Sequence, residues 1–360
     1  MKGKERVRVA MLNGKPDCVP VIPQICIPHA VRVLGLNYEE TLLEVVRHPE
    51  LMNKIVFDCV KYYGVDGLRA WIPSEPMDVI KVDGKWHGQD PKTGQLLGLI
   101  DFAGGGSIVP SEEPTLKTDE DIDSIPVVPA EKIIKGGKLD SVKAIIEEAK
   151  DDYFVISHPG LFTFEHLTFV RGKIQAMMDI MDNPKFCHKA LEKALQVAIQ
   201  NGLALVSIGI DALLIADTFG GIISPKQFQE FCFPYFKRFV EAMKGQGVLI
   251  YMHICGNSRR LFEAIADTGV NCIEPLDPLG GVEVSDAKDR VGHRVALMGG
   301  VNTVKLARGS LPEVVADCRR CLNQGAVGGG YILAAGDMLP TETVPEKVKA
   351  MVEMAHEHRY

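Results

Sequence analysis

The chain has 360 residues, of which 46% are hydrophobic and 24% are charged, as is typical of a soluble globular protein. No apolar run approaches the roughly 20 residues that span a bilayer, and residues 1–17 lack the apolar segment of a signal peptide. The formal charge of −7 argues against a nucleic-acid binder that relies on bulk charge. The nine cysteines are an odd number, so we expect reduced thiols or metal ligands in a cytoplasmic protein.

Eight short apolar segments follow one another along the chain, and helical patterns separate most of them. They are continuous apolar runs, as parallel strands covered on both faces are. Helix signals agree, since Ser224 and Pro225 read as an N-cap followed by a first-turn proline. Eight β/α units predict one α/β domain over residues 1–360, a TIM (β/α)8 barrel, with a doubly wound open sheet as the alternative. The expected strands are 19–25, 64–71, 154–160, 211–217, 248–255, 272–276, 295–301 and 331–337.

Residues 78–110 interrupt this alternation. They contain two turn signals, Asp83-Gly84 and Thr93-Gly94, and an acidic segment with prolines follows them. The pattern predicts a β-hairpin insertion near residues 78–110, which we expect to form a flap on the barrel and not a separate domain.

Polar side chains stand at the predicted strand ends, where the active sites of TIM barrels lie. In an apolar pocket Asp66 would act as a base, an acid or a hydrogen-bond acceptor, or it would cap the next helix. Asp217 would bind substrate or organise the loop that follows it. The full set of polar candidates is Gln24, His29, Asp66, Arg69, His158, Asp217, Thr218, His253, Cys255, Glu274, Asp277, Asn302 and Asp337.

His253 and Cys255 lie two residues apart at the end of the apolar segment VLIYMHIC, so they face the same side of a strand. An imidazole nitrogen and a thiolate suit zinc, which takes about four ligands and keeps one position open in a catalytic site. Two ligands alone do not make a site, and a buried thiol beside a hydrogen-bonded histidine is the alternative.

Segments along nearly the whole chain resemble the uroporphyrinogen decarboxylase superfamily, which includes cobalamin-dependent methyltransferases as well as decarboxylases. The resemblance implies an enzyme built on a TIM barrel. It extends to both the methyltransferase branch and the decarboxylase branch. The similar segments are GVDGL, RGKIQAMMDIMDNP, IGIDALLIADTFGGIISPKQFQEFCFPYFKRFV, YMHICGN and GGYILAAGDMLPTETVPEKV.

The decarboxylase branch binds a substrate with many carboxylates through an arginine-rich motif, and this chain keeps only Arg32 in that region. The histidine that this branch carries in the turn after the last strand is absent as well. Asp66 matches the position of the key aspartate of the branch. A metal-independent decarboxylase-like lyase that uses Asp66 is therefore one alternative for the function.

The methyltransferase branch binds zinc through an H-x-C pair at the place of His253 and Cys255. Its third ligand is a cysteine after the last strand, where this chain reads AGD at 335–337. We expect Glu274 to supply an oxygen ligand instead, with Asp337 as the other candidate.

The resemblance implies a zinc-dependent methyltransferase of a corrinoid system, which moves a methyl group between a small methylated substrate or thiol and a corrinoid protein that carries the cobalamin. A non-catalytic corrinoid-handling protein is a second alternative, and the resemblance to the decarboxylases adds the expectation of a homodimer. The sequence leaves the methyl donor, the acceptor and the direction of transfer open. The expected catalytic residues are Asp66, His253 and Cys255, and the expected substrate-binding residues are His29, Arg69, His158 and Asp217.

Overall fold

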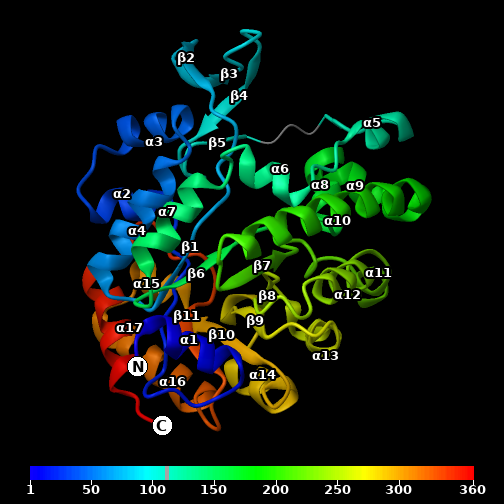
Figure 1. Cartoon of the computed structure of the whole chain (residues 1–360). Coiled ribbons are helices and arrows are strands. Elements are labelled where there is room, and N and C mark those ends of the chain that lie inside the picture. The colour runs from blue at the N-terminus through cyan, green and yellow to red at the C-terminus, as the bar shows by residue number, and fades with distance from the viewer. Residues whose placement is uncertain (110–112) are drawn as a thin grey trace.

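The computed structural model describes residues 1–109 and 113–360 and contains a parallel sheet of seven strands (Figure 1). The strands lie in the order β1-β6-β7-β8-β9-β10-β11, so each new strand is added beside the previous one. This is an α/β, TIM-like sheet, in agreement with the predicted fold class. The strands are β1 (Gly67–Arg69), β6 (Phe154–Ser157), β7 (Ala212–Ala216), β8 (Leu249–His253), β9 (Cys272–Leu276), β10 (Ala296–Val301) and β11 (Tyr331–Ala335).

The first predicted strand is reduced to a short stretch between the two edges of this sheet. Val21 forms a parallel bridge with Leu333 of β11, and the amide of Ile22 donates to the carbonyl of Leu333 at 3.1 Å. On the other side, the amide of Asp66 donates to the carbonyl of Val21 at 2.9 Å. Prolines at positions 20 and 23 have no amide hydrogen to donate, which keeps the pairing this short.

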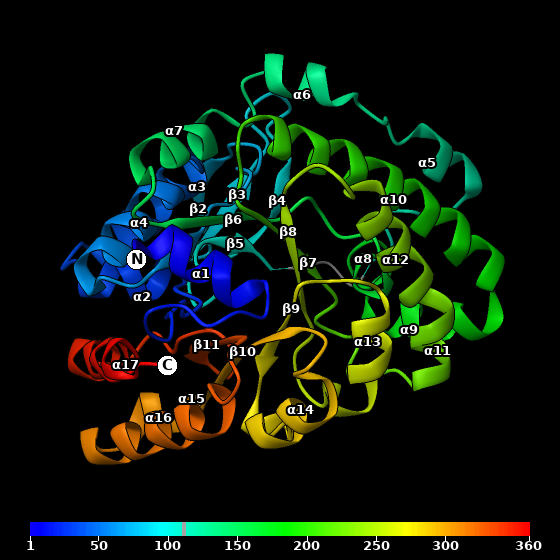
Figure 2. The same cartoon turned by 60° about the horizontal axis from the view of Figure 1, so that its bottom comes forward.

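Helices cover the outside of the sheet, and α1 closes its amino end (Figures 1 and 2). No helix in the part of the chain that the structure describes is both long and apolar enough to cross a bilayer. The helices are α1 (Gly3–Met11), α2 (Ile27–Val33), α3 (Tyr38–Arg47), α4 (Leu51–Tyr63), α5 (Asp119–Ser124), α6 (Ala130–Lys135), α7 (Asp140–Ala149), α8 (Phe164–Arg171), α9 (Lys173–Asp182), α10 (Pro184–Ser207), α11 (Pro225–Phe231), α12 (Phe233–Ala242), α13 (Phe262–Asp267), α14 (Val284–Val291), α15 (Thr303–Arg308), α16 (Leu311–Gly325) and α17 (Pro345–Glu357).

Side chains alternate between the inside of the sheet and the helices, as the period of two requires. On β7 the side chains of Ala212 and Leu214 belong to the interior cluster, whereas Leu213 and Ile215 pack against the helices. Tyr251 on β8 and Cys272 on β9 also face the interior, so the residues two positions further along these strands, which include His253, point the same way.

The region of the predicted hairpin folds as a second, antiparallel sheet of four strands that stands apart from the barrel (Figure 1). Its first two strands, β2 and β3, are joined by a tight turn and pair along their length. The sequence predicted one hairpin here, whereas the structure forms two further strands, and the predicted end at residue 110 lies outside the described residues. The strands are β2 (Asp78–Val82), β3 (Lys85–Gln89), β4 (Leu96–Asp101) and β5 (Ser107–Ile108).

Candidate metal centre

Three side chains at the carboxyl end of the sheet form a group that could hold a metal ion. His253 ends β8, Cys255 lies two residues beyond it, and Asp337 lies two residues beyond β11. One nitrogen, one sulfur and one oxygen atom from these side chains lie within 4.8 Å of one another. His253 Nε2 is 2.9 Å from Cys255 Sγ, and Cys255 Sγ is 3.6 Å from Asp337 Oδ1. Such a mixed donor set fits zinc.

The orientation of His253 is fixed by Glu274 on the neighbouring strand. Glu274 Oε2 lies 2.5 Å from His253 Nδ1. Because the ionised carboxylate can only accept, the Nδ1 proton of His253 points to it, and in the neutral form of the ring that can bind a metal the lone pair is on Nε2, which faces Cys255. A carboxylate in this position is usual behind a histidine that binds a metal.

Glu274 is in turn paired with Arg69. Arg69 Nη2 donates to Glu274 Oε1 at 2.8 Å, and the exposed fractions of the two side chains are 7% and 2%. Burial works to raise the pKa of Glu274, but the charges of Arg69 and His253 outweigh it and lower the pKa to about 2. Glu274 is therefore an ionised carboxylate with both oxygens already engaged.

The third member of the donor group differs from the predicted one. Glu274 was expected as the oxygen ligand, but its two oxygens face His253 and Arg69, and it lies outside the group of three. Asp337 takes that place, and its Oδ1 also accepts from the amide of Met338 at 2.8 Å. Burial, followed by the charges of Asp337 and Glu274, raises the pKa of Cys255 above its ordinary value. Without a cation the thiol keeps its proton.

His158 lies at the same end of the sheet as the metal group. It follows β6, and its ring stacks on Trp71 with ring centroids 6.0 Å apart. The amide of Gly160 donates to His158 Nδ1 at 2.9 Å. Burial, followed by the charges of His253 and Arg69, lowers the pKa of His158 to about 3, so the ring is neutral. The structure therefore brings His158 and Arg69 together with His253 at the carboxyl end of the sheet, as the sequence predicted.

Asp217 does not face this pocket. It follows β7 in the register of Leu213 and Ile215, which pack against the helices. Its Oδ2 accepts from the amide of Glu165 at 3.2 Å and from the thiol of Cys232 at 3.2 Å. Burial, together with the nearby charge of Glu165, raises the pKa of Asp217 to about 7. Of the two expected roles for Asp217, this position fits the loop-organising one and not substrate binding.

Asp66 lies at the opposite end of the sheet. It precedes the first residue of β1, so it sits at the amino edge, three residues before Arg69. Its carboxylate, 3% exposed, accepts from Arg6 at 2.5 Å, from the amide of Val21 at 2.8 Å and from His356 Nε2 at 2.9 Å. The expectation that Asp66 is a catalytic residue beside His253 does not match this place, because the sequence alone did not show where in the segment 64–71 the strand begins.

His29 is fully buried and serves packing between α2 and the segment before α17. Its Nε2 lies 2.8 Å from the hydroxyl of Tyr63, and its Nδ1 lies 3.1 Å from the carbonyl of Pro340. Both ring nitrogens are engaged within the protein, so His29 has no free polar atom for the substrate that the sequence predicted it to bind.

Two residues of the site were not among the sequence candidates. Trp71 stacks on His158, and the ring of Tyr251 lies 5.6 Å from the guanidinium of Arg69. Both follow the period of two, since Trp71 comes two residues after Arg69 and Tyr251 two residues before His253. That spacing was visible in the sequence and would have found them.

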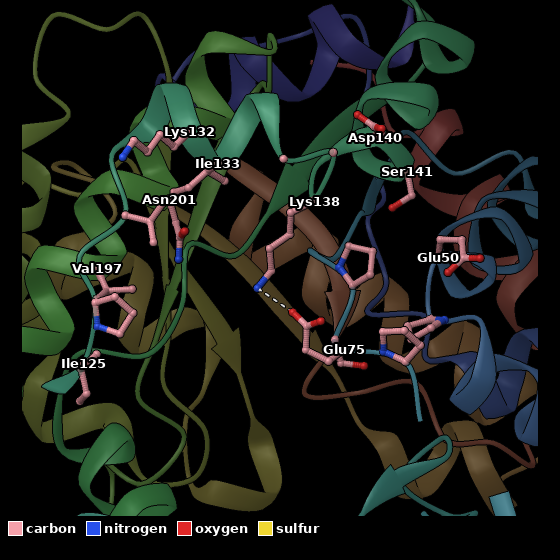
Figure 3. A pocket seen from close by; sticks show the side chains of 18 residues that line it. Glu50, Glu75, Ile125, Lys132, Ile133, Lys138, Asp140, Ser141, Val197 and Asn201 are labelled. Carbon is pink, nitrogen blue, oxygen red and sulfur yellow. Dashed lines mark ion pairs between the residues drawn. The ribbon is translucent and has the colours of Figure 1, made fainter. Parts of the chain in front are cut away.

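A cavity of about 910 Å³ lies beside this end of the sheet (Figure 3). It is bordered by the segments that follow β1 and α5, by the start of α7 and by α10. Lys138 Nζ lies 3.6 Å from Glu75 Oε1 across the cavity, as the dashed line in Figure 3 shows. The residues that line it do not include His253, Cys255 or Asp337, so it is an outer space and not the metal centre itself.

A family model described as uroporphyrinogen decarboxylase (URO-D) matches residues 100–358, more than half of the chain. The chain belongs to this family. A uroporphyrinogen decarboxylase from Tolumonas auensis is 28% identical over 271 residues, which cover 72% of this chain and 73% of the relative. One from Actinobacillus pleuropneumoniae is 27% identical over 274 residues, which cover 73% and 74%. The predicted membership of the superfamily is confirmed.

Solved structures support the fold of the chain. A methyltransferase from Methanosarcina mazei has a TM-score of 0.74 and 21% identity, and the match covers 99% of this chain and 98% of that one. A B12-independent methionine synthase from a Shewanella species has a TM-score of 0.50 and 9% identity, with 87% and 88% covered. At these identities the likeness shows the α/β, TIM-like fold alone.

Proposed function

We propose that the protein is a zinc-dependent methyltransferase of a corrinoid system, with His253, Cys255 and Asp337 as the zinc ligands. The observation that carries the proposal is the nitrogen, sulfur and oxygen donor set at the carboxyl end of the sheet, backed by Glu274. The structural neighbour named a methyltransferase supports the same choice within the family.

The residues of the chain prepare the site in three ways. Glu274 holds the proton of His253 on Nδ1, so that Nε2 is free to bind. Arg69 keeps Glu274 ionised and in place. Cys255 and Asp337 complete the donor set with two acidic groups. Zinc bound there supplies a Lewis acid that holds a thiol as thiolate or polarises the heteroatom of a methylated substrate.

Cobalamin on a partner corrinoid protein would supply the atom that carries the methyl group, so the proposal includes docking of such a protein over the carboxyl end of the sheet. Methyl transfer then runs between that partner and a small methylated substrate or a thiol. His158 and Trp71 stand beside the metal group and would shape the space that this substrate occupies.

Metal analysis tests the proposal. We expect about one zinc per chain in protein supplied with zinc, and loss of that zinc in Cys255→Ala and Asp337→Ala. Cys26→Ala is the matched control, because Cys26 is also half-buried and lies outside the donor group, and it should keep its zinc. Zinc-loaded protein should also move the methyl group of free methylcobalamin to 2-mercaptoethanol, which the cobalamin absorbance spectrum reports. Protein that takes up no zinc would refute the proposal.

A metal-independent lyase is the second candidate, favoured by the names of the curated relatives. The place of Asp66 weakens it, since that carboxylate is engaged at the amino edge of the sheet. Arg32, the one arginine in the segment that corresponds to the arginine-rich motif of the decarboxylases, is exposed and stacks on Tyr38. Conversion of uroporphyrinogen to coproporphyrinogen by metal-free protein would establish the lyase. Binding of a corrinoid protein without methyl transfer to any acceptor would instead indicate a corrinoid-handling protein.

A further inference from the structure

Helix α9 carries apolar side chains on two opposite faces. One face, with Ala176 and Ile180, is buried against the rest of the chain. Asp179 lies on the same face and is paired with Arg171 at 2.6 Å. A helix that is apolar all round is normally buried on every side. On α9, however, the second face is in contact with solvent. Its four side chains, 46–73% exposed at positions i, i+3, i+4 and i+7, are Ile174, Met177, Met178 and Met181.

Neighbouring elements add exposed apolar side chains near this face. Phe169 on α8 and Ile222 in the loop after β7 are both exposed. Gln227 Nε2 on α11 lies 3.4 Å from Met181 Sδ, so α11 borders the same surface. Figures 1 and 2 show α8, α9 and α11 side by side at one edge of the molecule. Large exposed apolar surfaces are rare on soluble monomers, and methionine side chains adapt readily to a protein partner.

The two ends of α9 carry opposite charges. Lys173 is the first residue of the helix and Asp182 is the last, and both are exposed. About 13 Å of helix axis separates them, so they do not pair with each other. Within the described part of the chain neither forms an ion pair, although Lys173 Nζ lies 5.2 Å from the ring centroid of Phe219. Both charges are therefore open to a partner molecule.

The pattern on α9 is self-complementary. A second α9 that runs antiparallel to the first, about a two-fold axis between Met177 and Met178, places residues at equal distances from the axis opposite each other. Ile174 then faces the partner's Met181, and Lys173 faces the partner's Asp182. Because the same patch serves on both copies, such a contact is isologous and closes after two chains.

A lipid surface fits this patch less well. Asp182 borders the apolar stripe, and the chain carries a formal charge of −7. Anionic lipid attracts clusters of lysine and arginine and repels such a surface. A second copy, in contrast, supplies both the apolar stripe and the two opposite charges that the patch requires.

The surface is already held in shape within one chain. Arg260 Nη2 donates to the carbonyls of Gly221 at 2.9 Å and Ile223 at 2.8 Å, which fixes the loop that carries Ile222. A preformed surface loses little conformational entropy when a partner docks. The same loop packs closely on the candidate metal centre, since a Cβ on Gly221 would come 2.6 Å from the carbonyl oxygen of Cys255.

We propose that the chain forms a two-fold dimer in which α9 packs antiparallel on α9 of a second copy, with Ile222 at the border of the interface. The apolar stripe supplies the buried centre of the contact, and Lys173 and Asp182 form an ion pair at each end. The resemblance to the decarboxylases raised the expectation of a homodimer without a surface for it. The dimer goes beyond the proposed methyl transfer, because it requires neither zinc nor a corrinoid partner.

The mass of the protein in solution, measured by analytical ultracentrifugation over a range of concentrations, tests this. We expect twice the 39.4 kDa of one chain at micromolar concentration. Met178→Lys sets like charges beside the axis, so it should raise the dissociation constant of the dimer at least about tenfold, as the loss of a central contact predicts. Leu97→Lys, on the small sheet, is the matched control and should leave the constant unchanged. Met178 is 51% exposed and Leu97 is 43% exposed.

Charge reversal tests the antiparallel arrangement. Lys173→Glu and Asp182→Lys each set like charges against each other at both ends of the helix pair. At low ionic strength, where surface charges are screened least, each should weaken the dimer about fivefold. The double variant Lys173→Glu/Asp182→Lys restores opposite charges and should recover the dissociation constant of the parent. Lys244→Glu, at an exposed position after α12, is the control and should change nothing.

Several results would overturn the proposal. They are a parent protein that stays monomeric, a dimer that Met178→Lys leaves intact, and a double reversal that is weaker than either single variant. Loss of the dimer in Leu97→Lys protein alone would place the interface on the small sheet instead. A monomer that docks a corrinoid protein through Met178 would assign the patch to that partner. Circular dichroism checks that each variant folds, and none of these measurements depends on zinc or turnover.

Discussion

The residues around His253 form a chain of buried polar contacts from one side of the barrel to the other. Arg69 donates to Glu274, Glu274 faces His253, and His253 faces Cys255. A buried ion pair contributes little net stability compared with an apolar pair, but removal of one partner leaves a buried charge without compensation. The pair between Arg69 and Glu274 is therefore better explained by the orientation that it imposes on His253 than by stability.

Replacing Arg69 by methionine should reveal this coupling. We expect Arg69→Met to lower the free energy of unfolding by about 3–5 kcal/mol, because Glu274 stays buried without its counter-charge. The double variant Arg69→Met/Glu274→Met should be more stable than Arg69→Met alone. Urea denaturation followed by circular dichroism measures both. If the unfolding free energy lost in the double variant equals the sum of the losses caused by each substitution alone, the two side chains are not coupled.

The Asp66 carboxylate has a structural role that a substitution can separate from the metal centre. Asp66→Asn weakens its contacts with Arg6 and His356, so we expect the free energy of unfolding to fall by roughly 2–4 kcal/mol. Zinc affinity, measured by competition with a chromophoric chelator, should stay within about twofold of the parent. If Asp66→Asn left the stability unchanged but abolished the activity, Asp66 would again be a candidate catalytic residue.

At the scale of elements, the sequence predicted the strands of the barrel well where they are buried on both faces. Strands β6 to β11 each begin within one residue of their expected starts, because long apolar runs between helices leave little choice. The first two predicted strands fared less well. Gly64 ends α4 in the left-handed conformation and Val65 is buried in the turn, so β1 begins at Gly67 and not at residue 64. That shift moved Asp66 from the expected pocket to the amino edge.

The second limit of prediction from the sequence was the direction in which side chains beyond the strand ends point. His253 and Cys255 could be placed together because their spacing follows the period of two. Asp217 needed the same reasoning across the end of β7, where Leu213 and Ile215 set the outward register. The choice between Glu274 and Asp337 depended on Arg69, a contact between residues 205 positions apart that no local pattern contains.

Helix α16 allows a prediction on capping. Its N-cap Ser310 forms a capping box with Glu313, so Ser310→Ala should lower the free energy of unfolding by about 1 kcal/mol. Ser207→Ala, near the exposed end of α10, is the control and should have little effect because that hydroxyl bonds only within its own helix. Thermal and urea unfolding of both variants measure the difference. Equal effects would show that the box contributes nothing specific.

For the whole molecule, structural polar contacts gather at the amino end of the parallel sheet, whereas the proposed chemistry lies at the carboxyl end. At the amino end, Asp17 and Asp66 bind Arg6, and Asp66 also binds His356 near the C-terminus. At the carboxyl end lie the donor group, His158 and, beside them, the outer cavity of Figure 3. The proposed site therefore lies where TIM-barrel enzymes carry theirs, in the segments that follow the strands.

Zinc binding should stabilise the whole chain if the donor group forms only in the folded state. At a free zinc concentration 100-fold above the dissociation constant, we expect about 2.7 kcal/mol of added stability. A rise of the thermal midpoint with zinc, measured by scanning calorimetry, reports this, and Cys255→Ala protein should show no rise. A midpoint that rises equally in both proteins would point to zinc bound at other sites.

The pair of Arg69 and Glu274 also has a consequence for how the chain can be divided. Arg69 precedes residue 100, where the match to the family model begins, whereas His253, Cys255, Glu274 and Asp337 all follow it. A fragment that starts at residue 100 would retain every donor atom and still lack Arg69, whose guanidinium pairs with Glu274 Oε1. In such a fragment, His253 would face a Glu274 carboxylate that lacks the Arg69 counter-charge and competes with the imidazole for the proton on Nδ1. The residues before position 100 therefore contribute to the candidate metal centre through Arg69, although none of them belongs to the donor group.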